Sequence, residues 1–319
     1  MMQPLLMRLR QQRPDAEIHV LAPAWSAPLL ARMPEVAAVI ENPFAHGQFD
    51  WAGRKALGRH LGKTGFTQAY VLPNSWKSAL VPFFAGIPKR TGYHGEARYF
   101  LLNDRHRLDA AAMPRLVDRY AALAGPLVGP TPNPRLTSSP EQQRAVRAAL
   151  GLPPDVAPII FCPGAEYGPA KRWPARHFAD LALKVSRGGT PVWAIGSAKD
   201  AEAGAEIERL ADGAAQNLCG RTNLGQAIDL IAGARAVVSN DSGLMHVAAA
   251  LDRPLAAIYG SSSPGYTPPL SPRAKIVSLG LACSPCFKRE CPLQGADRMR
   301  CLNDVSPERV LATLETSDA

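Results

Sequence analysis

Residues 158–182 read PIIFCPGAEYGPAKRWPARHFADLA, and this stretch decides the fold. Its first letters, PIIF, form a short apolar run of the kind found in strands that are buried on both faces of a parallel sheet. After Pro163 and Gly164 the apolar residues change to helical spacing, and we expect the helix to begin near Pro174 or Ala175. A buried strand that runs through a glycine-containing loop into a helix is the repeating unit of α/β folds.

The same alternation of short apolar runs and helical patterns continues along the chain. Strands are expected at residues 17–22, 36–40, 68–72, 158–161, 191–196, 235–239, 254–259 and 275–279. Helices are expected near residues 1–12, 175–187, 199–212, 223–233 and 242–251. Strands and helices that alternate at this spacing predict parallel sheets covered by helices on both faces.

A stretch rich in Pro, Gly and Ser separates the two halves of the chain. Residues 125–143, GPLVGPTPNPRLTSSPEQQ, have the composition of a linker. The sequence therefore predicts two doubly wound α/β domains, at residues 1–135 and 144–319. Such domains bind ligands at the carboxyl ends of their strands, and we expect the site in a central crevice between them.

The composition is that of a globular protein with an uneven charge distribution. Of the 319 residues, 46% are hydrophobic and 20% charged, which excludes a disordered chain. Neither a signal peptide nor an apolar run of ~18 residues is present, so we expect a cytoplasmic location. Residues 1–150 hold 19 Lys and Arg against 10 Asp and Glu, whereas residues 151–319 hold 17 of each kind.

The basic surplus of the first half predicts an anionic partner, which can be a membrane surface, a phosphorylated or acidic substrate, or nucleic acid. Nucleic acid is disfavoured because few aromatic residues lie among the charges and no nucleic-acid-binding motif is present. The alternative is a basic surface that only aids solubility.

The loop after the strand expected at 158–161 is the first candidate site. Lys171 precedes the expected start of a helix at the carboxyl end of a strand, where a cation can neutralise a bound phosphate. Gly168 would let the backbone approach such a ligand closely. The Walker spacing of a P-loop is absent. The alternative is that Gly164 and Gly168 only shape the turn and that Lys171 is solvated.

The second candidate site is SNDSGLMHVAAAL, residues 239–251. We expect Asp241 or Ser242 to cap the helix that follows, which directs the amide of Gly243 towards a diphosphate. His246 lies one turn further, on the same helix face as Ser242, although a structural histidine is the alternative. An ionised Asp241 only accepts hydrogen bonds and therefore suits sugar hydroxyls better than phosphates.

Weaker candidates lie at other strand ends. Asp200 is positioned to accept ribose hydroxyls and Thr222 to line a base pocket, although either can equally be a helix cap. In the basic first half, Ser75, Lys77 and Arg98 are expected to hold an acidic acceptor, with ordinary surface charge as the alternative.

Four of the six cysteines are close in sequence. Cys283, Cys286, Cys291 and Cys301 have C-x2-C-x4-C-x9-C spacing, which allows a tetrahedral zinc site or a disulfide-bonded loop. A cytoplasmic location disfavours stable disulfides. The segment follows the last expected strand, so we expect any metal there to be structural.

The motifs taken together resemble a known family. PGAEYGPAKRWPARHFADLA, NLCGRTNLGQAIDLI and SNDSGLMHVAAAL resemble donor-domain motifs of the ADP-heptose:lipopolysaccharide heptosyltransferases, glycosyltransferase family 9. LAPAWSAPLLARMPEV, LPNSWKSAL, RTGYHGEARYFLLND and CSPCFKRECPL narrow the resemblance to the heptosyltransferase II branch. The resemblance implies a GT-B fold, with two Rossmann-like domains that bind the acceptor in the N-terminal one and the nucleotide sugar in the C-terminal one.

The same resemblance implies an activity: inverting transfer of L-glycero-D-manno-heptose from ADP-heptose to the first heptose of the lipopolysaccharide inner core. It assigns Lys171 to the diphosphate and the leaving ADP. Asp241, Ser242, Gly243 and His246 would hold the heptose and the phosphates, and Asp200 and Thr222 the ribose and adenine. The implied acceptor is of the heptosyl-Kdo2-lipid A type. This would bring the protein to the inner leaflet of the inner membrane as a peripheral protein, and the chemistry would need no cofactor.

The start of the chain departs from the family pattern. The family has an N-terminal strand and then a Gly-Asp loop whose aspartate is the expected general base, whereas MMQPLLMRLRQQRPDA resembles the helix after that loop. We therefore expect the base to lie upstream of Met1, and this chain to transfer heptose poorly and to have a destabilised N-terminal domain. The alternatives are an inactive or non-catalytic nucleotide-sugar-binding protein and a GT-B-like nucleotide-sugar epimerase. A Rossmann oxidoreductase is disfavoured because no G-x-G-x-x-G follows an expected strand.

Overall fold

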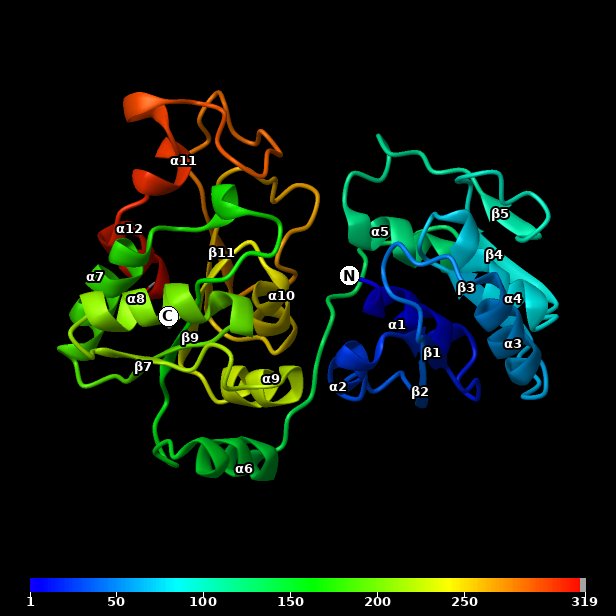
Figure 1. Ribbon diagram of the computed structural model, residues 1–319, viewed down its shortest axis with the longest axis horizontal. Helices are drawn as coiled ribbons and strands as arrows, with labels where there is room; N and C mark the ends of the chain where they lie inside the picture. Colours follow the sequence, from blue (N-terminus) through cyan, green and yellow to red (C-terminus); the bar gives the residue numbers. More distant parts are fainter. Residues whose placement is uncertain (316–319) are drawn as a thin grey trace. The chain divides into compact units, whose positions relative to one another are not determined.

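The computed structural model describes residues 1–315, which fall into two compact units, and each is described here by itself (Figure 1). The N-terminal unit comprises residues 1–27 and 35–132. The C-terminal unit comprises residues 28–34 and the chain from Asn133 onward. The sequence predicts domains at residues 1–135 and 144–319. Whether these ranges fold independently stays a prediction.

The C-terminal unit is built on a six-stranded sheet whose neighbouring strands are all parallel. Its strands are β6 (Ile159–Cys162), β7 (Val192–Ala194), β8 (Ala215–Asn217), β9 (Ala236–Asn240), β10 (Leu255–Ile258) and β11 (Ala274–Val277). They are arranged in the order β11-β10-β9-β6-β7-β8. The chain thus builds outward from β6 in one direction, returns, and builds outward in the other, so that the topological switch point lies between β6 and β9.

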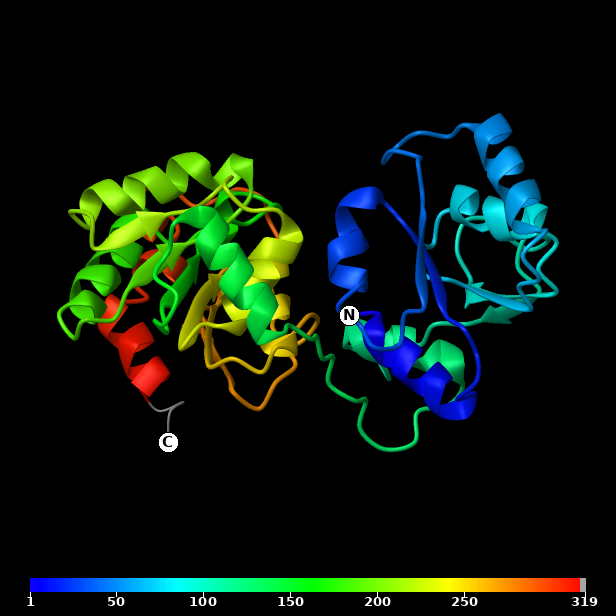
Figure 2. The same cartoon turned by 90° about the horizontal axis from the view of Figure 1, so that it is seen from below.

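Helices cover both faces of this sheet, as Figures 1 and 2 show. They are α6 (Pro140–Leu150), α7 (Ala175–Ser186), α8 (Ala201–Leu210), α9 (Leu224–Ala232), α10 (Gly243–Ala250), α11 (Arg300–Asn303) and α12 (Pro307–Glu315). Alternate residues of β6 enter two separate cores: Phe161 packs with α7, α8 and α12, and Ile160 packs with α6, α9 and α10. Burial on both faces explains why PIIF is continuously apolar.

The N-terminal unit contains two smaller parallel sheets. One pairs β1 (His19–Ala22) with β2 (Ala38–Glu41), and the other has β3 (Gln68–Val71), β4 (Lys89–Tyr93) and β5 (Asp104–His106). The helices are α1 (Gln3–Gln12), α3 (Trp51–Leu61), α4 (Leu80–Phe84) and α5 (Leu116–Ala121), with α2 (Ala27–Leu30) where the chain passes to the other unit. Leu5 of α1 packs in one apolar cluster with Tyr93 and Leu123.

The α/β class is confirmed, but several elements were not predicted. Strands β4, β5 and β8 have polar sequences (KRTGY, DRH and AQN), which carry no apolar run to reveal them. Helix α6 begins inside the stretch expected to be a linker. There the Ser139 side chain accepts a hydrogen bond from the Gln142 amide, the Gln142 side chain binds back to Ser139, and Pro140 occupies the first helical position. The capping box S-P-E-Q was the missed signal.

Residues 28–34 join the C-terminal unit through a buried ion pair. A guanidinium nitrogen of Arg32 lies 2.7 Å from Oδ2 of Asp229 on α9, and both side chains are largely buried. The Ser138 hydroxyl donates to the other oxygen of Asp229 at 2.8 Å. The contact joins positions almost 200 residues apart, so no local sequence pattern indicates it.

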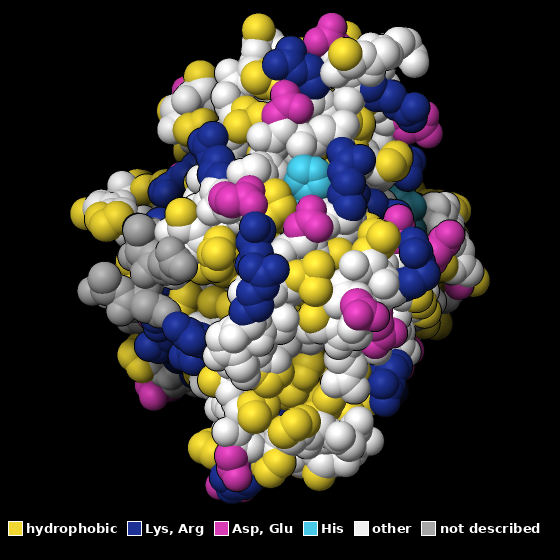
Figure 3. All heavy atoms as spheres, turned by 90° about the vertical axis from the view of Figure 1, so that its left-hand side faces the viewer, with side chains coloured by type: hydrophobic (Ala, Val, Ile, Leu, Met, Phe, Trp, Pro, Cys, Tyr) yellow, Lys and Arg dark blue, Asp and Glu magenta, His cyan; other side chains and the backbone are white. Residues whose placement is uncertain are grey.

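Among residues 1–315, none of the helices combines the length and the apolar composition that crossing a membrane requires. On the face of the molecule in Figure 3, basic and acidic side chains are interspersed and do not segregate into patches of one sign.

Candidate functional site

The switch point of the C-terminal unit brings two chain segments together. Strands β6 and β9 are paired with Cys162 opposite Ser239, so the segments after both strands leave the same edge of the sheet. The fully buried Asn240 joins them: its amide nitrogen donates to the Pro163 carbonyl at 2.7 Å, and its oxygen accepts from the Trp173 amide at 3.0 Å. The loop that carries Lys171 is therefore held against the end of β9.

Lys171 and Asp241 meet at this edge. The Lys171 ammonium lies 2.5 Å from Oδ2 of Asp241, with the two side chains 18% and 6% exposed. The ammonium also lies 5.4 Å from the centre of the Tyr167 ring. Lys171 is thus held by a partner and is not freely solvated, and its remaining hydrogens can reach a ligand.

The N-terminus of α10 has no side-chain cap, contrary to expectation. Ser242 occupies the N-cap position, but its side chain makes no capping bond in the described structure, and its hydroxyl lies 3.3 Å from that of Ser239. The Asp241 carboxylate is engaged by Lys171 instead. The first amides of α10, beginning at the exposed Gly243, are therefore left for an anion.

His246 lies one turn into α10 and is half-buried. Desolvation by burial is the main cause that lowers the pKa of His246 to about 4, and the Asp241 carboxylate opposes this shift. The imidazole is therefore neutral near pH 7. It can exchange hydrogen bonds with a sugar hydroxyl, but it adds no positive charge for a phosphate.

Asp200 and Thr222 occupy neighbouring strand ends. The Asp200 carboxylate accepts from the Ser197 amide at 2.9 Å and from its hydroxyl at 2.7 Å, and so caps the short helix η5 (Ala198–Asp200). A Cβ on Gly164 would lie 2.5 Å from this carboxylate, so glycine is needed for the close approach. Thr222 is not the cap of α9, because Asn223 fills that role.

Gly168 has a different partner from the one expected. A Cβ at Gly168 would lie 2.5 Å from the Arg289 carbonyl oxygen, which also accepts from the Ala170 amide. The glycine therefore allows contact with another loop of the protein, at a φ of +155°.

The sequence motifs did not predict that Asn240 and Trp173 position the loop that carries Lys171. The available signal was a polar Asn at the end of an apolar strand, because a buried amide has to find hydrogen-bond partners.

In the N-terminal unit, Arg98 is a buried side chain that binds two backbone carbonyls and one side-chain amide. Its guanidinium donates to the Pro73 carbonyl at 2.7 Å, to Oδ1 of Asn74 at 3.3 Å and to the Tyr93 carbonyl. These contacts tie it to the segment just before Ser75. Lys77 donates to the Gln48 carbonyl at 3.3 Å. The three residues expected to bind the acceptor thus belong to two linked loops at the ends of β3 and β4.

The structure does not confirm the zinc site that the spacing of the four clustered cysteines allows. Burial and the neighbouring thiols of Cys283, Cys291 and Cys286 raise the pKa of Cys301 to about 11, so the four lie near one another. All are free thiols, and residues 1–315 contain no group of three or more His, Cys, Asp or Glu placed to hold a metal. Neither the zinc site nor the disulfide-bonded loop that the spacing allows is supported.

Three comparisons with known proteins match most of this chain to the same kind of protein. Residues 54–297 match the family model of glycosyltransferase family 9 (heptosyltransferase). The lipopolysaccharide heptosyltransferase 2 of Salmonella typhimurium is 46% identical, with 99% of this chain and 94% of that protein covered. The Escherichia coli protein of the same name is 47% identical, with 98% of this chain and 93% of that protein covered. The solved structure of E. coli ADP-heptose lipopolysaccharide heptosyltransferase II superimposes with a TM-score of 0.86 at 45% identity, with 99% of this chain and 95% of that chain covered.

Proposed function

The chain belongs to glycosyltransferase family 9, the heptosyltransferases, and on that premise we propose that it transfers L-glycero-D-manno-heptose from ADP-heptose to the first heptose of the lipopolysaccharide inner core. The GT-B fold and the family expected from the motifs are confirmed. The relatives described are transferases, which does not favour an epimerase or a non-catalytic binding protein. The observation that carries the proposal is the Lys171–Asp241 pair at the switch point.

In the proposed reaction the acceptor hydroxyl attacks the anomeric carbon of the donor and gives its proton to a general base. The bond from that carbon to the diphosphate breaks with inversion, and ADP leaves with the bonding electrons. Lys171 and the first amides of α10 would stabilise the charge that develops on the diphosphate. Asp241 and the neutral His246 would orient the heptose hydroxyls. This chemistry needs no cofactor.

The remaining predicted residues receive proposed roles. Ser242 and Gly243 would contact the diphosphate, Asp200 the ribose and Thr222 the adenine. Asp200 has lone pairs left beyond its two bonds to Ser197, and Thr222 is not used as a cap.

The acceptor would bind to the N-terminal unit, where Ser75, Lys77 and Arg98 lie on linked loops. The relatives are lipopolysaccharide heptosyltransferases by name, and we propose as acceptor a lipid intermediate of the heptosyl-Kdo2-lipid A type. The basic surplus of residues 1–150 supports peripheral contact with an anionic membrane, on the cytoplasmic side of the inner membrane.

Calorimetric titration of the donor tests the proposal. ADP-heptose is expected to bind at least tenfold more tightly than GDP- or UDP-sugars. Lys171→Ala should weaken the binding of both ADP and ADP-heptose roughly 10- to 100-fold, because a charge-assisted contact to the diphosphate is lost. Asp241→Asn should weaken the binding of ADP-heptose but not that of ADP, because a carboxylate contacts sugar hydroxyls and not phosphates.

Lys199→Ala is the matched control. Lys199 lies in the neighbouring strand-end loop, pairs with Glu166 at 2.6 Å and is highly exposed. Its removal should leave both affinities within twofold. Equal binding of all three nucleotide sugars, or equal effects of the two lysine variants, would overturn the assignment.

A further inference from the structure

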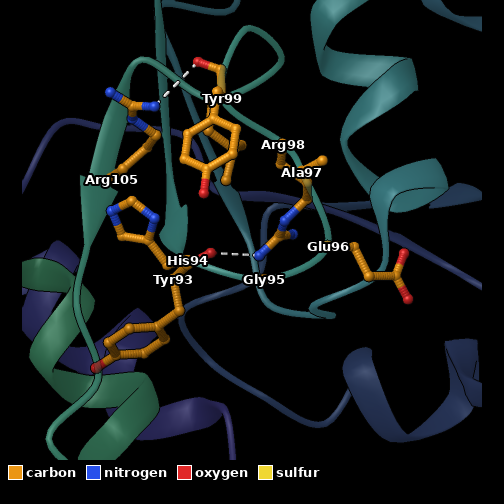
Figure 4. Close-up of a pocket in the computed structure, with 9 residues that line it drawn as sticks. Tyr93, His94, Gly95, Glu96, Ala97, Arg98, Tyr99 and Arg105 are labelled. Atoms are coloured by element: carbon orange, nitrogen blue, oxygen red, sulfur yellow. Dashed lines mark hydrogen bonds between the residues drawn. The ribbon is translucent and has the colours of Figure 1, made fainter.

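A cavity of about 270 Å³ lies in the N-terminal unit beneath the loop that connects β4 to β5 (Figure 4). It is lined by residues 93–99, Leu102 and Arg105. The lining contains two arginines, a histidine and two tyrosines, but only one carboxylate, that of Glu96. The proposed donor site lies in the other unit and does not explain this cavity.

The buried wall of the cavity is the Arg98 guanidinium, which is only 2% exposed. Its hydrogen bonds reach two carbonyls and one side-chain amide, all neutral, and its Nε has no partner in the described structure. Burial lowers the pKa of Arg98, and the Glu96 carboxylate opposes that shift. A buried cation held only by neutral groups is incompletely compensated and favours an incoming anion.

The loop is built around this guanidinium. A Cβ on Gly95 would lie 2.9 Å from the Asn74 carbonyl oxygen and 3.5 Å from a guanidinium nitrogen of Arg98, so only glycine fits. Glu96 has a φ of +24°, which is unusual for a residue with a side chain. It is held there because its carboxylate accepts from the Trp76 amide at 2.6 Å. That bond also draws part of the negative charge away from the cavity.

The open wall combines a second cation with an aromatic face. The Arg105 guanidinium lies 5.4 Å from the centre of the Tyr99 ring and donates to the Tyr99 carbonyl at 3.3 Å. The His94 ring meets Tyr99 edge-on at 6.0 Å. Figure 4 shows His94 and Arg105 on the same side of the Tyr99 ring. Tyr99 is 57% exposed, so its ring and the guanidinium beside it are accessible to a ligand.

We propose that this cavity binds an oxyanion, a carboxylate or phosphate carried by a sugar residue of the acceptor saccharide. Arg105 would contact the anion through its planar fork, Tyr99 would pack against the sugar ring, and Arg98 would supply the fixed positive charge behind them. Drug-sized ligand pockets usually start at about 300 Å³, so this one suits a single sugar residue or a phosphate group. The inference rests on the proposed function for the identity of the acceptor.

Acceptor kinetics test the proposal in the full chain. Arg105→Ala is expected to raise the KM for the intact acceptor roughly tenfold, with kcat and the KM for ADP-heptose within twofold. Arg105→Lys should recover part of the loss, because it keeps the charge but not the fork. Arg107→Ala, an exposed arginine two positions along that does not line the cavity, is the control and should change nothing.

Two altered acceptors distinguish whether the cavity binds a phosphate or a carboxylate. One acceptor is dephosphorylated, and the other has its sugar carboxylates reduced to alcohols. The effect of Arg105→Ala should disappear for the form that lacks the anion bound in the cavity. An equal effect on all three acceptors, or no difference between the variants at positions 105 and 107, would overturn the proposal.

A second measurement does not depend on heptose transfer. Inorganic phosphate is titrated into protein with ¹⁵N-labelled arginine while the Nε–H resonances are followed by NMR. Saturable shifts of the Arg98 and Arg105 signals in the wild type, with the Arg98 shift lost in Arg105→Ala, support the site even if no transfer occurs, in which case only the proposed function fails. Their absence at tens of millimolar phosphate contradicts it.

Discussion

At the scale of single residues, the C-terminal site balances one cation against one carboxylate and keeps a neutral imidazole beside them. Lys171 and Asp241 neutralise each other in the absence of ligand. A diphosphate would therefore compete with Asp241 for the ammonium, and the carboxylate released would be ready to accept hydroxyls. His246 contributes hydrogen bonds without changing this charge balance, because its pKa of about 4 keeps it neutral.

The lowered pKa of His246 predicts a pH dependence of stability. An unfolded histidine titrates near pH ~6.5, so as the pH falls the unfolded chain takes up a proton before the folded one does. The stabilisation is complete above about pH 6.5 and is lost as the pH falls towards 4, up to about 3 kcal/mol. Urea unfolding should show this extra loss in the wild type and not in His246→Gln.

An exposed histidine provides the comparison for that measurement. His60 lies at the end of α3 and is exposed, so His60→Gln should keep the acid sensitivity of the wild type. If His246→Gln and the wild type lose stability in parallel between pH 6.5 and 4, another group is responsible.

At the scale of elements, the segment 28–34 is tied to α9 and α6. Arg32 binds the buried Asp229, and its backbone carbonyl accepts from the Thr137 amide at 3.1 Å. Asp229 also accepts from Ser138, one residue before the cap of α6. One ion pair therefore positions two helices and a returning segment.

Removing Arg32 should destabilise the C-terminal unit strongly. Arg32→Ala leaves Asp229 buried without its cation, which costs about 3–5 kcal/mol in comparable buried pairs. Replacing both partners, in Arg32→Met with Asp229→Leu, should cost less than the single change. The measurement is the free energy of unfolding from chemical denaturation.

Arg144→Ala is the control for Arg32→Ala. Arg144 lies on α6, which packs against α9, but its pair with Glu141 spans 3.5 Å and is exposed. Its removal should change the free energy of unfolding by about 0.5 kcal/mol or less. A loss for Arg32→Ala that is no larger than this would show that the buried pair contributes little.

How far the sequence could lead is clearest at this scale. The strand at 158–161 was predictable, because apolar residues on both faces follow from burial between two helical layers. The β5 strand DRH was not, because its three polar residues carry no apolar pattern, and their partners on β4, such as Thr91 opposite Asp104, are known only once the strands are paired. Lys171 and Asp241 were predictable as separate candidates from strand-to-helix signals. Their contact, like the anchoring role of Asn240, depends on residues that only the sheet order makes neighbours.

At the scale of the whole molecule, the charge surplus and a group of exposed aromatic rings fall in the same part of the chain. Phe49 and Trp51 are 48% and 44% exposed, and both rings stack against Trp76. Lys55 and Arg59 follow Trp51 at four-residue spacing along α3, so they share its helix face. Aromatic rings flanked by basic side chains suit the headgroup region of an anionic membrane.

Vesicle co-sedimentation should reveal this preference. Binding to vesicles with anionic lipid is expected to exceed binding to zwitterionic vesicles severalfold and to fall as salt is raised. The double change Lys55→Glu and Arg59→Glu should weaken it at least tenfold, since each basic residue near the surface contributes about 1 kcal/mol.

A charge-matched variant separates local from overall electrostatics. Lys275→Glu with Lys288→Glu alters two exposed lysines of the C-terminal unit and should have much less effect. Equal loss in both double variants, or equal binding to the two kinds of vesicle, would contradict a membrane-facing surface on α3.

The sequence by itself determined the class of fold, the family and the candidate residues at strand ends, because burial periodicity, turn residues and short motifs are local properties of the chain. Tertiary structure decided which of those residues have partners. It paired Lys171 with Asp241, left the N-terminus of α10 uncapped, used Asp200 as a cap and built a loop around Arg98. These outcomes depend on contacts between residues far apart in sequence, which local patterns do not specify.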